Sequence, residues 1–325
     1  MLNRVCCAFG LTFAFSALQA WSDELPIMPV GWAAVADSQN GTGTTGGSGG
    51  RMVTVTDAES LVAAALQTDA QTILISGRIE LTKSVRIGSN TTLRGLGPNA
   101  ALAGGGLHLR RVQNVVIQNL TITGGSDAVS IEESHHVWVD HCDLSRCRDG
   151  LLDIKRGSDF ITVSWNRFHD RHKTCLLGHS DKADIRKLDT GHLRVTYHHN
   201  FFDGTKTRHP RVRFADGVHV FNNYFRGNEY GVASLMDAGV IVESNVFEDV
   251  EHPTLIQYGD SPDPGRLTAR NNLLLESGAL ETRGEVDQKQ LLYRYIIDPP
   301  EQIAELVSGG AGVQDVSPPS GTSAE

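Results

Sequence analysis

The chain has 325 residues, with 29 lysines and arginines against 38 aspartates and glutamates, and its formal net charge is −9. This acidic balance argues against a general nucleic-acid binder, because affinity for a phosphate backbone comes from clustered cations. The length is sufficient for one large core. After residue 20, no apolar stretch approaches the length of a membrane span.

The first 20 residues, MLNRVCCAFGLTFAFSALQA, predict a secretory signal peptide. One arginine precedes an apolar run that is too short to span a membrane, and small residues lead to the end of the segment. We therefore expect an exported, soluble protein, either extracellular or periplasmic. In an oxidising compartment Cys142 and Cys147 are the local candidates for a disulfide, with Cys175 left over, and buried free thiols are an equal alternative.

Two short segments precede the main body of the chain. Residues 40–50 form a flexible glycine-rich stretch, and Thr56 with Glu59 matches the capping-box pattern that begins a helix, here predicted over 60–67. From about Thr72 onward, helical periodicity gives way to short β-branched runs separated by turn residues.

A template of the form apolar-x-apolar-x-x-Asn-x-(Phe/Leu) recurs along the rest of the chain. Five full copies begin at Ile161, Val195, Val218, Val240 and Leu267, and two weaker copies at Val115 and Val137 carry Leu120 and Cys142 in the Asn position. The spacings are 22, 24, 34, 23, 22 and 27 residues. Strand-like units at a period near 22 predict a parallel β-helix, in which each coil buries its apolar face on the next. The repeated Asn is either a turn residue with left-handed backbone or part of a ladder of amides. The long interval predicts an inserted loop, often on the binding face of a solenoid.

Charged residues recur at nearly the same offset in successive repeats. Asp127, Asp149 and Lys173 each lie twelve residues past the start of a repeat, and Arg208 lies thirteen past. Neighbouring coils are about 4.8 Å apart. These four side chains are therefore predicted to form one row on one face of the coil.

The signs of these charges suggest what the row binds. Adjacent aspartates, with Asp153 close by, repel one another unless they point into water or share a cation. An all-oxygen ligand set selects a hard ion instead of Zn²⁺, and an open, flexible site favours Ca²⁺ over Mg²⁺. Lys173, Arg208 and Arg213 add fixed positive charge beyond them. This combination suits a polymer of sugar acids. The histidines of the repeats are expected to be structural, because their spacing offers no third ligand for a zinc site.

Several segments resemble polysaccharide lyase family 1, the pectate lyases, in the family's order. They are VWVDH at 137–141, DGLLDIKRGS at 149–158, KTCLLGHSD at 173–181, RHPRVR at 208–213 and YRYIIDPPEQIAELV at 293–307. The resemblance covers about residues 30 to 312 and implies an all-β fold, a right-handed single-stranded parallel β-helix with a short N-terminal helix. We accordingly expect a signal peptide over 1–20, a β-helix domain over 21–312 and a disordered tail over 313–325.

The resemblance also implies roles for individual residues. By position, the family implies Ca²⁺ ligands at Asp127, Asp149 and Asp153, contacts to substrate carboxylates from Lys173 and Arg213, and proton abstraction by Arg208. Many members carry an acidic residue where this chain has Gly125, which implies weaker metal binding in the absence of substrate. The three aspartates argue against the related pectin lyases, which act on methyl esters without calcium.

The implied activity is Ca²⁺-dependent β-elimination on α-1,4-linked polygalacturonate, the de-esterified form of pectin, by a secreted monomer. The products would be 4,5-unsaturated oligogalacturonides. An alkaline optimum is expected, since arginine is normally protonated and its neutral form is scarce near pH 7. Two alternatives remain at this point: a polygalacturonase-type hydrolase, and a non-catalytic β-helix that binds acidic polysaccharide.

Overall fold

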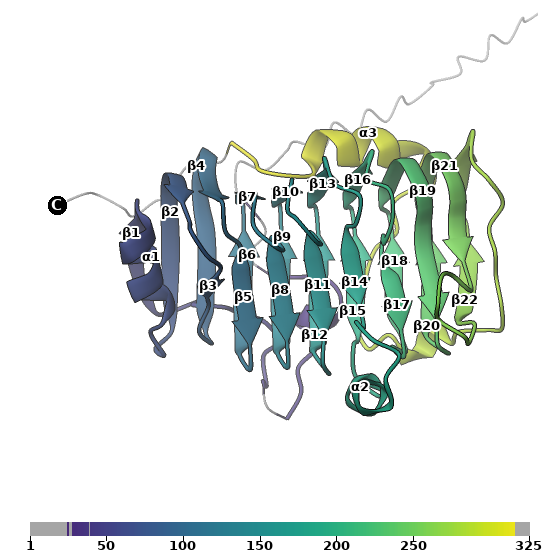
Figure 1. The fold of residues 1–325 in the computed structure, drawn as a ribbon, viewed down its shortest axis with the longest axis horizontal. Helices are drawn as coiled ribbons and strands as arrows, with labels where there is room; N and C mark the ends of the chain where they lie inside the picture. Colours follow the sequence, from purple (N-terminus) through teal and green to yellow (C-terminus); the bar gives the residue numbers. More distant parts are fainter. Residues whose placement is uncertain (1–24, 26–27, 39, 316–325) are drawn as a thin grey trace, which may run out of the picture.

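The computed structural model describes residues 25, 28–38 and 40–315. The expected signal peptide and residues 316–325 of the expected tail lie outside this part. The described chain winds into a parallel β-solenoid of about ten turns (Figure 1). The predicted right-handed parallel β-helix is thereby confirmed.

Three parallel sheets run along the solenoid. The first contains β1 (Arg51–Val55), the first halves of β2 (Gln71–Glu80) and β4 (Thr91–Ala103), β6 (Gln113–Gln118), β9 (His135–Asp140), β12 (Asp159–Ser164), β15 (Val195–His198), β18 (Val218–Phe221), β20 (Gly239–Glu243) and β22 (Arg266–Arg270). The second contains the remainder of β2 and β4, then β7 (Thr121–Thr123), β10 (Asp143–Ser145), β13 (Arg167–His169), β16 (Phe201–Asp203), the first parts of β19 (Tyr224–Leu235) and β21 (Val246–Leu255), and β23 (Leu273–Leu275). The third contains β3 (Val85–Arg86), β5 (Leu107–Arg110), β8 (Val129–Glu132), β11 (Leu152–Lys155), β14 (Cys175–Leu177), β17 (Arg211–Arg213) and the ends of β19 and β21.

The sequence repeats coincide with the register of the first sheet. Val115 pairs with Val137, Val137 with Ile161, and Ile161 with Val195. Each of these side chains is fully buried. The apolar positions of the template therefore point into the solenoid, where each coil packs on the next.

The repeated Asn forms the ladder of amides. The side-chain NH₂ of one Asn donates to the side-chain oxygen of the next, at 2.9–3.0 Å, through Asn166, Asn200, Asn223, Asn245 and Asn272. The left-handed backbone belongs to the residue before each Asn, as at Trp165 (φ 53°) and His199 (φ 53°). The bend and the ladder are thus made by neighbouring residues.

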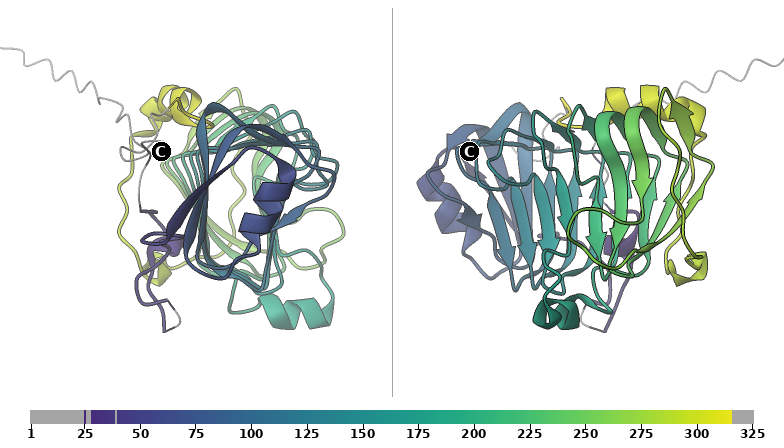
Figure 2. Two further views of the ribbon diagram at one scale, coloured as in Figure 1. Left: turned by 90° about the vertical axis from the view of Figure 1, so that its left-hand side faces the viewer. Right: turned by 45° about the vertical axis from the view of Figure 1, so that its right-hand side comes forward.

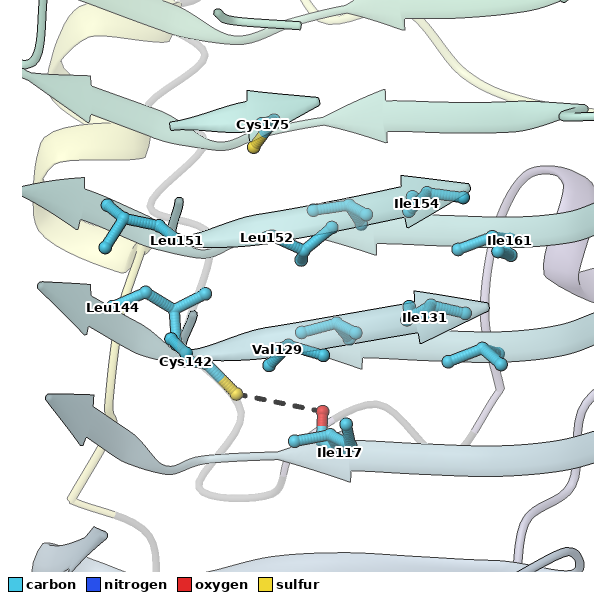
Figure 3. Close-up of a cluster of buried hydrophobic side chains, with 14 of the residues drawn as sticks. Ile117, Val129, Ile131, Cys142, Leu144, Leu151, Leu152, Ile154, Ile161 and Cys175 are labelled. Atoms are coloured by element: carbon cyan, nitrogen blue, oxygen red, sulfur yellow. Dashed lines mark hydrogen bonds between the residues drawn. The ribbon is translucent and has the colours of Figure 1, made fainter. Parts of the chain in front are cut away.

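The three cysteines belong to the apolar interior, where Figure 3 shows Cys142 and Cys175. Cys142, Cys147 and Cys175 are buried and free, so the free-thiol alternative holds. Cys142 occupies a ladder position: its backbone N–H donates to Asn166 Oδ1 at 2.9 Å and its thiol donates to the carbonyl of Ile117 at 3.8 Å. Burial raises the pKa of the Cys142 thiol to about 12.

Helices lie at one end and on the outside of the solenoid (Figure 2). α1 (Ala58–Ala65) covers the N-terminal end, α2 (Ala183–Asp189) lies in the predicted insertion, and α3 (Pro300–Gly310) packs Ile303 and Val307 against Phe201, Tyr224 and Val246. Two 3-10 turns, η1 (Trp32–Ala34) and η2 (Gln288–Gln290), lie in the terminal segments. None of the described helices is long and apolar enough to cross a bilayer.

The start of α1 differs from its prediction. Asp57 is the N-cap and accepts from the backbone N–H of Ser60 at 2.9 Å, so the cap lies one residue after the predicted Thr56. Asp is at least as effective an N-cap as Thr, and Thr56 and Asp57 are adjacent, so the sequence alone does not distinguish the two positions. The helices α2 and α3 were not predicted.

Candidate active site

The predicted charged residues occupy the turns that lead from the second sheet into the third. Asp127 precedes β8, Asp149 precedes β11, Lys173 precedes β14, and Arg208 precedes β17. Asp153 lies within β11 and Arg213 ends β17. All six residues are therefore carried by consecutive coils on one side of the solenoid.

The row is in register at its start and shifts by one residue at its end. The backbone N–H of Asp149 donates to the carbonyl of Ser126, which places Asp149 beside Asp127. Lys173 pairs with Thr207 instead of Arg208. The extra residue counted in the spacing of Arg208 therefore corresponds to a one-position offset in the row.

The carboxylates of Asp127 and Asp153 face a common space. Asp127 Oδ1 accepts from the backbone N–H of Gly150 at 3.0 Å. A Cβ placed on Gly150 would lie 2.6 Å from Asp153 Oδ1 and 3.5 Å from Asp127 Oδ1. Because glycine has no side chain, this position keeps the space between the two carboxylates open.

Asp153 is the most unusual of the acidic residues. Its side chain is 7% exposed, and its Oδ1 atom is buried without a hydrogen-bond partner in the described part of the chain. Burial raises the pKa of Asp153 to about 7, with a further contribution from the negative charge of Asp127. Among the described residues, Lys155 is the cation paired with it, and its Nζ lies 4.0 Å from Asp153 Oδ2. An unsatisfied buried oxygen that faces the carboxylate of Asp127 fits a hard divalent cation such as Ca²⁺.

Gly125 does not leave room for a fourth acid. A Cβ at this position would lie 2.8 Å from the backbone carbon of Gly105 and 3.0 Å from the carbonyl oxygen of Asp127. A side chain there would require the backbone to move. The acidic residues that this row offers to a cation are the three predicted aspartates, and the carboxylate of Asp149 is bound to Lys173 in this structure.

The first basic residue of the row, Lys173, is bound directly to one of the acidic residues. Lys173 Nζ donates to Asp149 Oδ1 at 3.0 Å, and this bond lowers the pKa of Asp149. Arg171, which sequence reasoning did not single out, donates to the backbone carbonyls of Arg148 and Asp149 and so holds this turn. Arg208 has a left-handed backbone (φ 72°), and its side chain forms no hydrogen bond or ion pair with the described residues. Arg208 is therefore the one member of the row whose charge is not engaged within the described chain.

Arg213 is enclosed by residues that the sequence did not point to. Its side chain is buried, Nε lies 2.7 Å from Asp181 Oδ1, and Nη1 donates to the carbonyl of Gly178 at 3.0 Å. The hydroxyl of Ser261 donates to the other oxygen of Asp181 at 3.1 Å. Burial lowers the pKa of Arg213. Asp181 comes from the insertion and Ser261 from a distant loop, so only the fold reveals this arrangement.

Away from this row, the fold supplies a third ligand that the sequence spacing did not. Ligand atoms of Asp37, His135 and His136 lie within 4.8 Å of one another. Asp37 reaches the two histidines from the N-terminal segment, far away in the sequence. The expectation that no third ligand lies near a pair of histidines is therefore wrong for His135 and His136.

Comparison with known proteins agrees with the geometry. A sequence description of the family named "Pectate lyase" matches residues 26–272. A pectate trisaccharide-lyase of Bacillus licheniformis is 35% identical over 299 residues, covering 85% of each chain. A probable pectate lyase B of Aspergillus terreus is 38% identical over 297 residues, covering 87% of this chain and 88% of the other.

The fold is likewise similar to that of known enzymes. A pectate lyase from Bacillus sp. N165, solved in complex with trigalacturonate, matches with a TM-score of 0.77 and 28% identity, covering 89% of this chain and 100% of the other. With most of the chain matched in both sequence and structure, this protein belongs to the pectate lyase family, whose members are polysaccharide lyases.

Proposed function

We propose that this protein is a secreted, Ca²⁺-dependent lyase that cleaves α-1,4-linked polygalacturonate by β-elimination and releases 4,5-unsaturated oligogalacturonides. The observation that carries the proposal is the environment of Asp153. Its unsatisfied buried oxygen lies in a cluster of acids, and the unengaged guanidinium of Arg208 is carried on the same side of the solenoid. Secretion is supported by the signal-peptide pattern of residues 1–20.

The acidic cluster would hold the cation. Asp127, Asp149 and Asp153 offer carboxylate oxygens, the ligands that Ca²⁺ prefers. When bound, Ca²⁺ neutralises the uronate carboxylate next to the reacting carbon. A cation would also remove the cost of leaving Asp153 ionised and unpaired.

The basic residues would do the chemistry. Lys173 and Arg213 contribute positive charge for carboxylates of the substrate. Arg208 takes the proton from C5, the C5–H electron pair becomes the C4–C5 double bond, and the C4–O bond breaks with its electrons on the leaving sugar, which gains a proton from water. Only the neutral guanidine can accept this proton, and positive charge nearby disfavours the protonated form. Lys173, Arg211 and Arg213 lie in the same or the adjoining turns.

The relatives are consistent with this substrate. One is named for pectate and for a trisaccharide, and another was solved with trigalacturonate. Both names concern those proteins. We transfer only the substrate class, polygalacturonate, and leave the length of the product to measurement.

The direct test is the ultraviolet absorbance of the unsaturated product during incubation with polygalacturonate. We expect absorbance to rise with Ca²⁺, to stop on addition of EDTA, and to resume when Ca²⁺ is restored in excess. New reducing ends without absorbance would indicate a hydrolase, and binding without either signal would indicate a non-catalytic solenoid. Either result would overturn the proposal.

Substitution of the proposed base tests the role of Arg208. Arg208→Lys keeps the positive charge but moves it, so kcat should fall by about 10²–10⁴-fold while substrate is still bound. Arg211→Lys is the matched control, because Arg211 donates to the carbonyl of Tyr258 within the protein, and a smaller loss is expected. Near-normal turnover by Arg208→Lys would show that another group is the base. For the unaltered protein, kcat should increase toward alkaline pH.

A further inference from the structure

The pair His135 and His136 lies where the third sheet leads into the first, at the start of β9. This turn is at the opposite end of the third-sheet strands from the acidic cluster, because the aspartates precede or begin these strands and the histidines follow them. Asp37 joins the pair from the N-terminal segment. The three residues play no part in the lyase chemistry proposed above.

The orientation of His136 is fixed by its surroundings. Its Nε2 lies 2.9 Å from the carbonyl oxygen of Val35, and its ring stacks on Phe160 with centroids 4.9 Å apart. A carbonyl only accepts, so Nε2 carries the proton and Nδ1 presents a lone pair. Metal-binding histidines are commonly oriented in this way, with the other ring nitrogen donating to a carbonyl.

The free nitrogen of His136 faces its neighbour. Nδ1 of His136 and Nδ1 of His135 are 2.8 Å apart, so Nδ1 of His135 either carries a proton that it donates to His136 or shares a cation with it. Asp37 is held nearby, since its Oδ1 accepts from the backbone N–H of Asn40 at 2.6 Å. Two imidazole nitrogens and one carboxylate oxygen thus lie within 4.8 Å of one another.

A second histidine pair provides an internal comparison. His198 and His199 also approach through their Nδ1 atoms, at 2.9 Å, and the second histidine of each pair has a left-handed backbone. That pair is buried, and the one carboxylate bound to it within the described residues, Asp298, lies on Nε2 of His199, away from the shared contact. Local backbone geometry therefore explains the close pair. The carboxylate on its open side and the partial exposure of His135 are specific to the first pair.

We propose that Asp37, His135 and His136 form a binding site for a divalent transition-metal ion such as Zn²⁺. Imidazole nitrogen suits Zn²⁺, Co²⁺ or Ni²⁺, whereas Ca²⁺ prefers an all-oxygen set. Three protein ligands leave a fourth position of a tetrahedral ion for water. The ion displaces the shared proton and links the N-terminal segment to β9, so binding should also stabilise the fold.

The test uses the full chain, freed of metal and titrated with Co²⁺ and then Zn²⁺ in the absence of substrate. We expect one equivalent of Co²⁺ to give a visible absorption band that Zn²⁺ abolishes, and Zn²⁺ to raise the melting temperature. His135→Ala and Asp37→Asn should each weaken Zn²⁺ binding by about tenfold or more. His252→Ala removes an exposed histidine elsewhere and should bind like the parent.

Absence of the Co²⁺ band would overturn the proposal. So would equal Zn²⁺ affinity in His135→Ala and the parent, or equal loss in His252→Ala, which would indicate adventitious surface binding. The result is independent of the proposed lyase function, because the readouts are spectroscopic and thermal. In the EDTA experiment, restoring activity with Ca²⁺ alone separates the two sites.

Discussion

Asp153 has a buried carboxylate oxygen without a hydrogen-bond partner in the described chain, and burial with the charge of Asp127 raises its pKa to about 7. The pKa in the folded state is above the ordinary value of 3.8. Between about pH 4 and pH 7 the folded protein therefore holds a proton that the unfolded chain has lost. Stability falls as pH rises through this window, unless a cation compensates the charge.

Replacing Asp153 with Asn should remove this pH dependence. In EDTA, we expect the melting temperature of the parent to fall from pH 4 to pH 7 relative to that of Asp153→Asn, because the amide has no charge to bury. Added Ca²⁺ should raise the melting temperature of the parent at pH 8 and leave the variant nearly unchanged. Parallel melting curves for the two proteins, with and without Ca²⁺, would contradict the proposed cation site.

Asp181 is expected to position Arg213. The ion pair between them is 2.7 Å long, and Ser261 holds the other oxygen of the carboxylate. In Asp181→Asn the guanidinium loses its charged partner and is free to reorient, so KM for polygalacturonate should rise by about tenfold with a smaller change in kcat.

Asp184→Asn alters an exposed acid on α2 and serves as the control for the change in charge. Asp181→Glu should restore part of the KM. A loss of stability with unchanged KM would assign Asp181 a purely structural role.

At the level of elements, the sequence predicted the strands, whose burial pattern repeats in every coil. It did not predict the exact start of α1 or the presence of α2, which depend on a few local residues. The strands of the first sheet follow the template because burial in every coil selects the same apolar positions. The cap of α1 was misplaced by one residue because Thr56 and Asp57 are both good N-caps. α2 was missed because it is short and mostly charged, and helices of this length depend on context.

The amide ladder yields a prediction about position within an element. Asn223 donates to Asn245 and accepts from Asn200. Asn272 is the last amide of the ladder: it accepts from Asn245, and its own NH₂ donates to the backbone carbonyl of Val242. Asn223→Ala breaks the ladder and leaves buried polar groups unsatisfied on both sides, which should cost about 2–5 kcal/mol of unfolding free energy.

Asn272→Ala should cost clearly less, because Asn272 is partly exposed and water can replace it. Chemical denaturation of the two variants measures the difference. Equal losses would mean that the ladder does not act as a connected unit.

Over the whole molecule, the sequence was sufficient to predict the solenoid and to place the charged residues together on one side of it. Both follow from one period, so counting along the chain places Asp127 beside Asp149. Contacts between segments without a common period could not be counted in this way. Asp181 reaches Arg213 from an insertion, Asp37 reaches His135 from the N-terminal segment, and the tight packing of Gly125 depends on the backbone of the preceding coil.

The N-terminal segment connects several coils on the side away from the charged row. The backbone N–H of Trp32 donates to Thr196 Oγ1 on β15, and its indole Nε1 donates to the carbonyl of Gly217 at 2.8 Å. The adjacent N–H of Ala33 donates to Thr162 Oγ1 on β12. Because each coil otherwise contacts only its neighbours, a segment that spans several coils should increase the cooperativity of unfolding.

Trp32→Ala tests this connection. The indole is 2% exposed and packs edge-on against Phe160 and Tyr293, so its loss should cost about 3–5 kcal/mol. Val30→Ala is the matched control in the same segment, because Val30 is 41% exposed and should have little effect. Thermal unfolding followed by circular dichroism should show a lower and broader transition for Trp32→Ala only, while lyase activity well below that transition stays near the parent level, since the charged row is carried by other turns. A transition as high and sharp as that of Val30→Ala would show that the coils are held together without this segment.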